Sequence, residues 1–225
     1  MIISYDTHDK IEPLDDDLMI IKTSSQSVYL DILNGLNDRN DLIKVFDNEY
    51  NKLEKSKYID FYGDLISSNG LSTKQISSII KKVVGYFDND DIDYMQRNIS
   101  SLNNFIQEKL FFWDIPLLIT QDIDIEKTIK KLNIHLNPDI EGNPYDIIEL
   151  LIRLKMETQD KSLIVVNNLA NYLNSDQLQS IEKLCKEFEV PLLDIEFGKN
   201  NDINNTDFSF CQYYFIDDNF VDWHS

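Results

Sequence analysis

The run Leu163-Ile164-Val165-Val166, followed by Asn167-Asn168, constrains the fold of this chain more than any other stretch. Four consecutive apolar residues that end in a polar pair predict a short strand buried on both faces, which is typical of the interior of a parallel sheet. The two asparagines mark the carboxyl end of that strand, where open α/β sheets place their ligands or partners. We therefore expect an α/β fold built around this strand.

A strand-helix-strand unit is predicted from this run onward. Asn174 and Gln177 have the spacing of a capping box, and apolar residues recur at helical intervals from Leu178 to Phe188. The segment Val190–Phe197 is typical of the next strand. A single crossover helix between two strands predicts that they are parallel and belong to one sheet.

Strand patterns at both ends of the chain extend this sheet. We expect strands at one edge of the sheet over Met1–Tyr5, Leu18–Lys22 and Leu42–Asp47, where short apolar runs occur. Phe208–Ile216 alternates aromatic and polar residues as a strand does, and the acidic, aromatic tail Asp217–Trp223 follows it. The predicted sheet is mainly parallel.

The middle of the chain has helical spacing instead. Ser72 and Gln75 form a second capping-box pattern, and a long helix is expected over Asp90–Trp113, with Phe111-Phe112-Trp113 packing at its end. A short helix is expected over Asp124–Leu132. We therefore predict an α/β head of residues 1–63 and 141–225 and an inserted α-helical leg of residues 64–140.

The composition argues against several classes of protein. The chain is 42% hydrophobic but has no run of eighteen apolar residues and no basic, apolar leader, so we place it in the cytoplasm and away from membranes. Its six glycines are scattered, and the pattern G-x-x-x-x-G-K-S/T is absent. Where nucleotide triphosphatases place a magnesium-binding acid, this chain has Asn167 and Asn168.

Neither the cysteines nor the histidines predict a catalytic site. Cys185 and Cys211 are far apart in sequence, and we expect both to be buried in a reducing compartment. His8, His135 and His224 are equally scattered and belong to no nucleophile or metal-ligand pattern. We predict no catalytic residue.

The run from Asp122 through Asp124 to Glu126 is the most ligand-like in the chain. Converging carboxylate oxygens suit calcium, and Asp139 and Glu141 supply further oxygens at the end of the predicted leg, although the EF-hand spacing is absent. In an extended chain the three carboxylates of the run share one face, whereas at a helix start Asp124 would be a cap. The sequence leaves both alternatives open.

Two groups of lysines stand out against a formal charge of −19. That charge argues against nucleic acid binding by the surface as a whole, because DNA is itself densely negative. Clustered lysines either contact phosphates without reading the sequence or form an ordinary solvated face. The two groups are Lys52, Lys55 and Lys57 before the predicted leg, and Lys127, Lys130 and Lys131 near its end.

Short stretches over most of the chain agree in order and spacing with one protein family. They are Val45-Phe46-Asp47, Asp64-Leu65-Ile66, Ile129–Ile134, Leu163–Leu169 with Tyr172, the strand to Glu196, and Phe215–Phe220. On these stretches the chain resembles the ring-forming adaptation proteins of type II-A CRISPR systems, the Csn-two family. No single stretch identifies the family, and the resemblance rests on their order.

The resemblance implies a head related to P-loop nucleotide triphosphatases without their active site, and a helical leg. It also implies a homotetrameric ring that binds calcium and holds double-stranded DNA through its centre, favouring free ends. The implied partners are the CRISPR integrase proteins and the large effector nuclease, during spacer acquisition. In this chain the six lysines and five acidic residues named above are the candidate DNA and calcium contacts.

Two other functions stay open from the sequence. The chain could be an acidic scaffold that touches no DNA and recruits proteins through the tail Phe220-Val221-Asp222-Trp223. It could also be a divergent nucleotide hydrolase, in which case a triphosphate should stabilise the native state.

Overall fold

Two units make up the part of the chain that the structure describes. The computed structural model describes residues 1–5, 8–66, 71–113, 115–119, 123–135, 137, 142–198 and 209–224. Met1–Asn69 and Asn137–Ser225 form the first unit, which we call the head unit. Gly70–Leu136 form the second, which we call the helical unit.

The head unit contains a six-stranded sheet in the order β5-β6-β7-β2-β8-β9. The first five strands in this order are parallel, and β9 is antiparallel to β8. This mostly parallel sheet confirms the predicted α/β class. The strands are β2 (Leu18–Thr23), β5 (Ile59–Gly63), β6 (Leu163–Asn167), β7 (Leu192–Phe197), β8 (Gln212–Ile216) and β9 (Asp222–His224).

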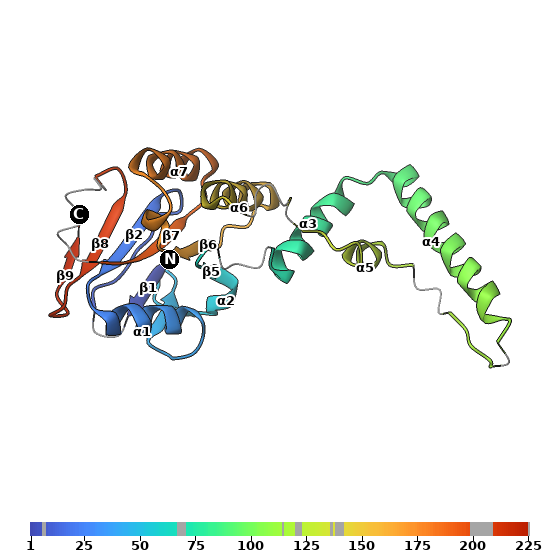
Figure 1. The fold of residues 1–225 in the computed structure, drawn as a ribbon, viewed down its shortest axis with the longest axis horizontal. Coiled ribbons are helices and arrows are strands. Elements are labelled where there is room, and N and C mark those ends of the chain that lie inside the picture. Colours follow the sequence, from blue (N-terminus) through green and yellow to red (C-terminus); the bar gives the residue numbers. More distant parts are fainter. Residues whose placement is uncertain are drawn as a thin grey trace. The chain divides into compact units, whose positions relative to one another are not determined.

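Three helices cover the two faces of this sheet (Figure 1). Helix α1 (Gln26–Leu36) lies on one face, and α6 (Pro144–Thr158) and α7 (Ser175–Phe188) lie on the other. The side chains of β2 alternate accordingly, because Leu18 and Ile20 belong to the core under α6 and α7, while neighbouring residues face α1. The predicted unit β6-α7-β7 is confirmed, and all residues of β6 are buried.

The amino-terminal strands differ from the prediction. Strand β2 lies inside the main sheet rather than at an edge, because β7 and β8 pair with its two sides. The strands β1 (Ile2–Tyr5), β3 (Ile43–Phe46) and β4 (Lys52–Leu53) form a separate antiparallel sheet. The short helix α2 (Lys55–Tyr58) connects this small sheet to β5.

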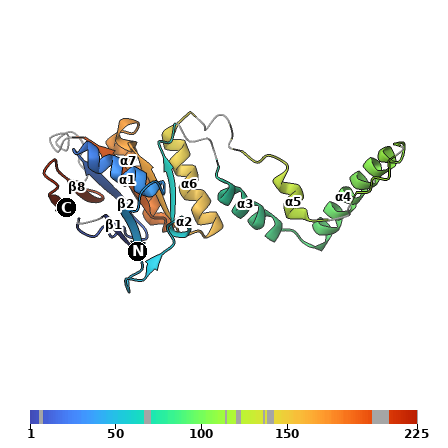
Figure 2. The ribbon, with the colours of Figure 1, turned by 90° about the horizontal axis from the view of Figure 1, so that it is seen from below.

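The helical unit contains α3 (Thr73–Gly85), α4 (Asn89–Leu110) and α5 (Ile125–Lys130). The predicted capping box of Ser72 and Gln75 starts α3, and α5 packs beside α3 (Figures 1 and 2). Ile80 and Ile129 are the only hydrophobic residues of this unit that are buried among those described. The unit therefore has a very small core.

Helix α4 has no buried residue, and residues 111–113 and 115–118 after it are exposed. The aromatic residues Phe111, Phe112 and Trp113 are 85%, 81% and 62% exposed, so the prediction that they pack at the helix end is wrong. After α4 the chain runs back beside the helix, where the Gln107 amide donates to the Leu117 carbonyl and accepts from the Ile119 N–H. No helix in the described part of the chain is long and apolar enough to cross a membrane.

Candidate functional site

The carboxyl edge of the parallel sheet is where an α/β protein of this kind would bind a ligand. Two strand-to-helix connections meet there. The connection from β2 to α1 consists of Ser24 and Ser25, and Ser25 caps α1 by accepting from the Val28 N–H at 3.4 Å. The connection from β6 to α7 covers residues 168–174. Neither connection contains a glycine or a lysine, so both lack the parts of a phosphate-binding loop.

Asn167 and Asn168, predicted to face a ligand, are held by Tyr29 of α1. The Asn167 amide donates to Tyr29 Oη at 3.3 Å, and Tyr29 Oη donates to Asn168 Oδ1 at 3.1 Å. Asn168 is also left-handed, with φ of 64°, and its N–H donates to the Ile195 carbonyl at 3.1 Å. Burial raises the pKa of Tyr29, so the phenol stays a neutral donor. The two amides therefore serve the structure of this edge.

Asp194 and Glu196 are two acids of β7 near this edge, and both are buried. Asp194 accepts from the Leu169 N–H at 3.3 Å, and Glu196 accepts from the Ala170 N–H at 2.7 Å. Within the described residues Asp194 Oδ2 has no donor, and burial together with the charge of Glu196 raises the pKa of Asp194 well above its ordinary value. The raised pKa favours the neutral form of Asp194, and the pair holds the loop after β6 through the N–H groups of Leu169 and Ala170.

A hollow of about 690 Å³ lies at the same edge, beside the start of α1. Its lining consists of Ser24, Ser25, Gln26, Ser27, Phe197, Gly198 and Asp218. No cation is among these residues, and the one charged group, Asp218, would repel a phosphate. The hollow therefore lacks the charge that a triphosphate needs.

The termini of the head unit meet in a cluster that the sequence did not reveal. His8 Nδ1 lies 2.7 Å from Asp222 Oδ1, the Asp9 N–H donates to Asp222 Oδ2 at 2.9 Å, and His224 Nε2 lies 3.2 Å from Asp9. The His8 ring stacks on Tyr5 with ring centres 4.7 Å apart. These contacts fix β9 against the amino terminus. They span more than 210 residues, so no local pattern could have predicted them.

The predicted calcium ligands are described only in part. Asp122, Asp139 and Glu141 lie outside the described residues. Asp124 caps α5, accepting from the Lys127 N–H at 2.9 Å and pairing with the Lys127 ammonium at 3.2 Å, and Glu126 lies in the first turn. That N–H and the ammonium lower the pKa of Asp124. The described residues contain no group of three His, Cys, Asp or Glu that could hold a metal, so the calcium site stays a prediction.

The first predicted lysine group is largely occupied by partners within the head unit. The Lys55 ammonium donates to the Gly35 carbonyl and pairs with Asp38 at 2.7 Å, and Lys57 pairs with Glu54 at 2.5 Å. Lys52 lies exposed on β4 and forms no ion pair with a described residue. These three side chains therefore present little net positive charge.

The second lysine group lies in the helical unit, where it joins lysines that the prediction missed. Lys130 and Lys131 are exposed and form no ion pair with a described residue, whereas Lys127 pairs with Asp124. Residues 71–87, which contain α3, include Lys74, Lys81 and Lys82 and no acid. The absence of acids over these residues is the sequence signal that could have found them.

Charge is unevenly divided between the two units. The helical unit contains 8 lysine and arginine residues and 9 acidic residues, whereas the head unit contains 13 and 31. Nearly all of the net charge of −19 therefore belongs to the head unit. The helical unit is the part of the chain with which a polyanion can most readily make contact.

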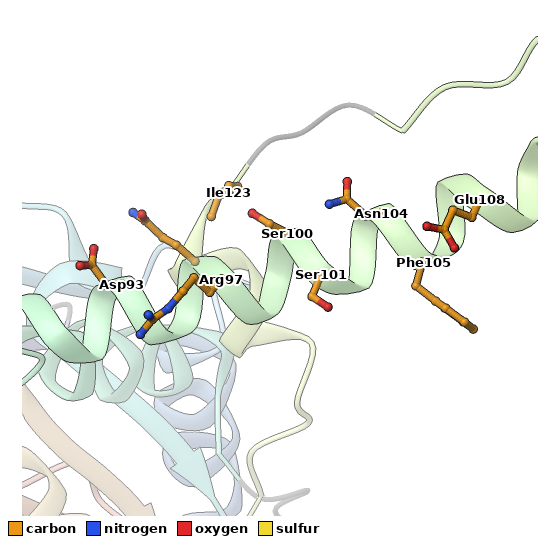
Figure 3. A pocket seen from close by; sticks show the side chains of 9 residues that line it. Asp93, Arg97, Ser100, Ser101, Asn104, Phe105, Glu108 and Ile123 are labelled. Atoms are coloured by element: carbon orange, nitrogen blue, oxygen red, sulfur yellow. The ribbon is translucent and has the colours of Figure 1, made fainter.

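A groove of about 790 Å³ runs along one side of α4 (Figure 3). Arg97, Ser100 and Asn104 lie along it and offer hydrogen-bond donors. The groove also contains Asp93 and Glu108 on either side of Arg97, so its acids outnumber its cation. This balance disfavours a phosphate ligand here.

A solved structure shares this fold. The chain is similar to Stu0660 of Streptococcus thermophilus with a TM-score of 0.60 and 12% identity, over 100% of this chain and 76% of that chain. Two ATP-binding cassettes of ABC transporters, MJ1267 in its ADP conformation and a nucleotide-free one, have TM-scores of 0.43 at 13% identity. The similarity to MJ1267 covers 95% of this chain and 85% of that chain. The similarity to the nucleotide-free cassette covers 92% of this chain and 79% of that chain. No protein-family model and no curated protein sequence match the chain.

Proposed function

We propose that this chain is a non-catalytic, calcium-dependent ring protein that holds double-stranded DNA, without reading its sequence, during CRISPR spacer acquisition. The ordered resemblance to the ring-forming adaptation family supports this function. The fold shared with Stu0660 over the whole chain is compatible with it, although at 12% identity that likeness concerns the fold alone. The observation that carries the proposal is an α/β head in which the described residues at the ligand edge lack the parts for nucleotide chemistry.

Three features of that edge support the proposal that the chain is not catalytic. The β2-to-α1 connection has only Ser24 and Ser25, so no loop can wrap a phosphate. Tyr29 holds the amides that stand in place of a magnesium-binding acid. The buried acids Asp194 and Glu196 accept hydrogen bonds from backbone N–H groups of the loop after β6. A divergent hydrolase would need a site that the described residues do not provide.

Assembly into a homotetramer is supported by α4. Its 22 residues span about 33 Å, yet no described helix or strand packs along it. Ile92, Met95, Ile99, Leu102 and Ile106 follow the alternating three- and four-residue spacing of a coiled-coil seam, and Leu102 is 61% exposed. A lone helix with such a stripe is marginal in water, so we propose that a second copy of the chain covers it.

The predicted acidic ligands are the reason why the proposal includes calcium. Asp124 and Glu126 supply carboxylate oxygens at the start of α5, but Asp124 would have to exchange its contact with Lys127 for the ion. Asp122, Asp139 and Glu141 are the other proposed donors. Bound calcium would reduce the repulsion among these acids and allow subunits to approach each other.

Sedimentation of the purified chain tests assembly and calcium together. We expect a tetramer with calcium and smaller species with a chelator, and a further increase in mass when a blunt duplex is added with calcium. The variant Asp139→Asn/Glu141→Gln should behave as the chelated protein does. A monomer that responds to neither calcium nor duplex would contradict the proposal.

An acidic protein scaffold is the alternative, and the exposed tail favours it. Phe220 and Trp223 are both 56% exposed, although Asp222 between them is bound to His8. If the scaffold is correct, Phe220→Ser/Trp223→Ser should abolish capture of the CRISPR integrase proteins and the effector nuclease, while the wild type should not bind duplex DNA. Partner capture that survives this double substitution would argue against the scaffold.

A further inference from the structure

The lysines of α3 occupy the side of the helix that faces away from its buried side. Gln75 and Ile80 are the buried residues of α3, and α5, whose Ile129 is also buried, packs against α3. Lys74 and Lys81 are seven residues apart, close to two helical turns, so they share a face, and both are exposed. Lys82 lies at the border of that face, with its ammonium 5.5 Å from the centre of the Tyr86 ring.

The chemistry of this face suits a phosphate backbone. Ser77 and Ser78 lie between the two exposed lysines at helical spacings of three and four residues, and they add hydroxyl donors to the ammonium groups. Lys74 and Lys81 are separated by about 10.5 Å along the helix axis, a distance on the scale of a DNA groove. Helix α3 itself contains no acid.

The neighbouring helix adds to the positive charge. Residues 123–135 contribute three lysines and two acids, and the acid Asp124 pairs with Lys127. Lys130 and Lys131 at the end of α5 are exposed without an ion-pair partner in the described part of the chain. Together α3 and this segment have six lysines against two acids, within a protein of net charge −19.

We propose that the lysine face of α3, with Lys74, Lys81 and Lys82, and the end of α5, with Lys130 and Lys131, form the surface that contacts the backbone of duplex DNA. This inference rests on the proposed function and locates its main contact surface away from Lys52, Lys55 and Lys57. Because α3 is fixed by its capping box and by α5, the lysines are presented on a rigid element. The contacts are electrostatic and carry no sequence information.

The test compares three triple variants of the full chain that lose the same charge. The first is Lys74→Gln/Lys81→Gln/Lys82→Gln, and the second is Lys52→Gln/Lys55→Gln/Lys57→Gln. The control, Lys44→Gln/Lys161→Gln/Lys183→Gln, removes three other exposed lysines of the head unit. The affinity for a blunt 30-base-pair duplex, with calcium, is measured over a series of salt concentrations. Circular dichroism verifies that each variant keeps its helix content.

We expect the affinity of the α3 variant to be lower by at least about tenfold. The magnitude of its slope of log affinity against log salt should decrease by about 2 to 3. The other two variants should stay within about threefold of the wild type. Adding Lys130→Gln/Lys131→Gln to the α3 variant should decrease the magnitude of this slope by a further one to two, approximately.

Two failures are distinguishable. If the wild type binds duplex and the α3 variant binds it equally well with an unchanged slope, this surface is wrong while the proposed function stands. If the wild type binds no duplex at any salt concentration, the proposed function and this surface fail together. Binding by the wild type to phosphatidylserine vesicles but not to duplex also overturns the inference, since a membrane would then be the partner.

Discussion

The head unit and the helical unit differ in what holds them together. The head unit buries apolar residues on both faces of a six-stranded sheet, whereas Ile80 and Ile129 are the only buried hydrophobic residues described in the helical unit. The head unit also carries nearly all of the net negative charge. The difference indicates that the head is a self-sufficient scaffold, while the helical unit exposes surface for contacts with other molecules.

The largest effect should come from Lys155, a buried cation of the head unit. Its ammonium pairs with Asp60 and with Asp160 at 2.9 Å, and it donates to Ser162 at 2.5 Å. Lys155→Met leaves two acids without their cation, and we expect a loss of about 3–5 kcal/mol in the free energy of unfolding, measured by urea denaturation.

The matched control on the same helix is Arg153→Met, which removes an exposed pair with Glu149. It should cost less than about 1 kcal/mol. Equal effects of the two substitutions would mean that the head does not depend on its buried ion cluster.

Ile80→Ala should be the most damaging apolar truncation in the helical unit. The residue is fully buried in α3, which packs against α5, and truncations of this kind cost about 2–5 kcal/mol. Hydrogen exchange should show faster exchange in α3 and α5, with β6 and β7 unchanged, because each unit has its own core. Leu102→Ala on exposed α4 is the control, with no loss of monomer stability above about 0.5 kcal/mol. Faster exchange throughout the head in Ile80→Ala would contradict the separation of the two units.

Acid should destabilise the head through Asp160. Burial acts to raise the pKa of Asp160, but hydrogen bonds from Lys155 and Ser162 outweigh burial and lower this pKa to about 2. Because the folded-state pKa is lowered, this stabilisation is present above about pH 4 and is lost as the pH falls towards 2. Because Asp160 is partly exposed, this stabilisation is limited to about 1–2 kcal/mol. Urea midpoints from pH 5 to pH 2 should fall less steeply in Asp160→Asn than in the wild type; parallel profiles would show that Asp160 contributes nothing.

Asp194 should show the opposite dependence on pH. Its folded-state pKa is raised by burial and by Glu196, so its stabilisation is complete below the unfolded pKa and is lost as the pH rises. In Asp194→Asn the amide can donate to Glu196 at every pH. We expect roughly 1 kcal/mol of added stability at pH 8 and little change at pH 4, from thermal unfolding. A destabilised variant at pH 8 would show that a charged Asp194 is required.

Local patterns predicted the elements of the head better than their order in the sheet. The capping boxes at Ser72 and Asn174 and the buried strand β6 are confirmed, because caps and apolar runs act over a few residues. The place of β2 between β7 and β8 could not be predicted, since its six buried residues have the same pattern wherever the strand lies in a sheet. That place is set by partners more than 170 residues away in the chain.

The candidate site shows the same limit. The sequence located Asn167 and Asn168, but their partner Tyr29 is nearly 140 residues distant. The candidate lysines were also predicted from their proximity in the sequence. That proximity does not reveal ion pairs, and the structure shows that Lys55 and Lys57 have acidic partners. Lys74, Lys81 and Lys82 were missed because they are spread over two turns of a helix.

Retention of DNA by topology tests the central claim most directly. The wild type with calcium is immobilised and offered a blunt linear duplex and a closed circle of the same sequence at equal concentration, and the bound fraction of each is measured. A ring that is threaded from a free end should retain the linear duplex and exclude the circle. Equal retention of both would contradict threading, and retention of neither would contradict DNA binding itself.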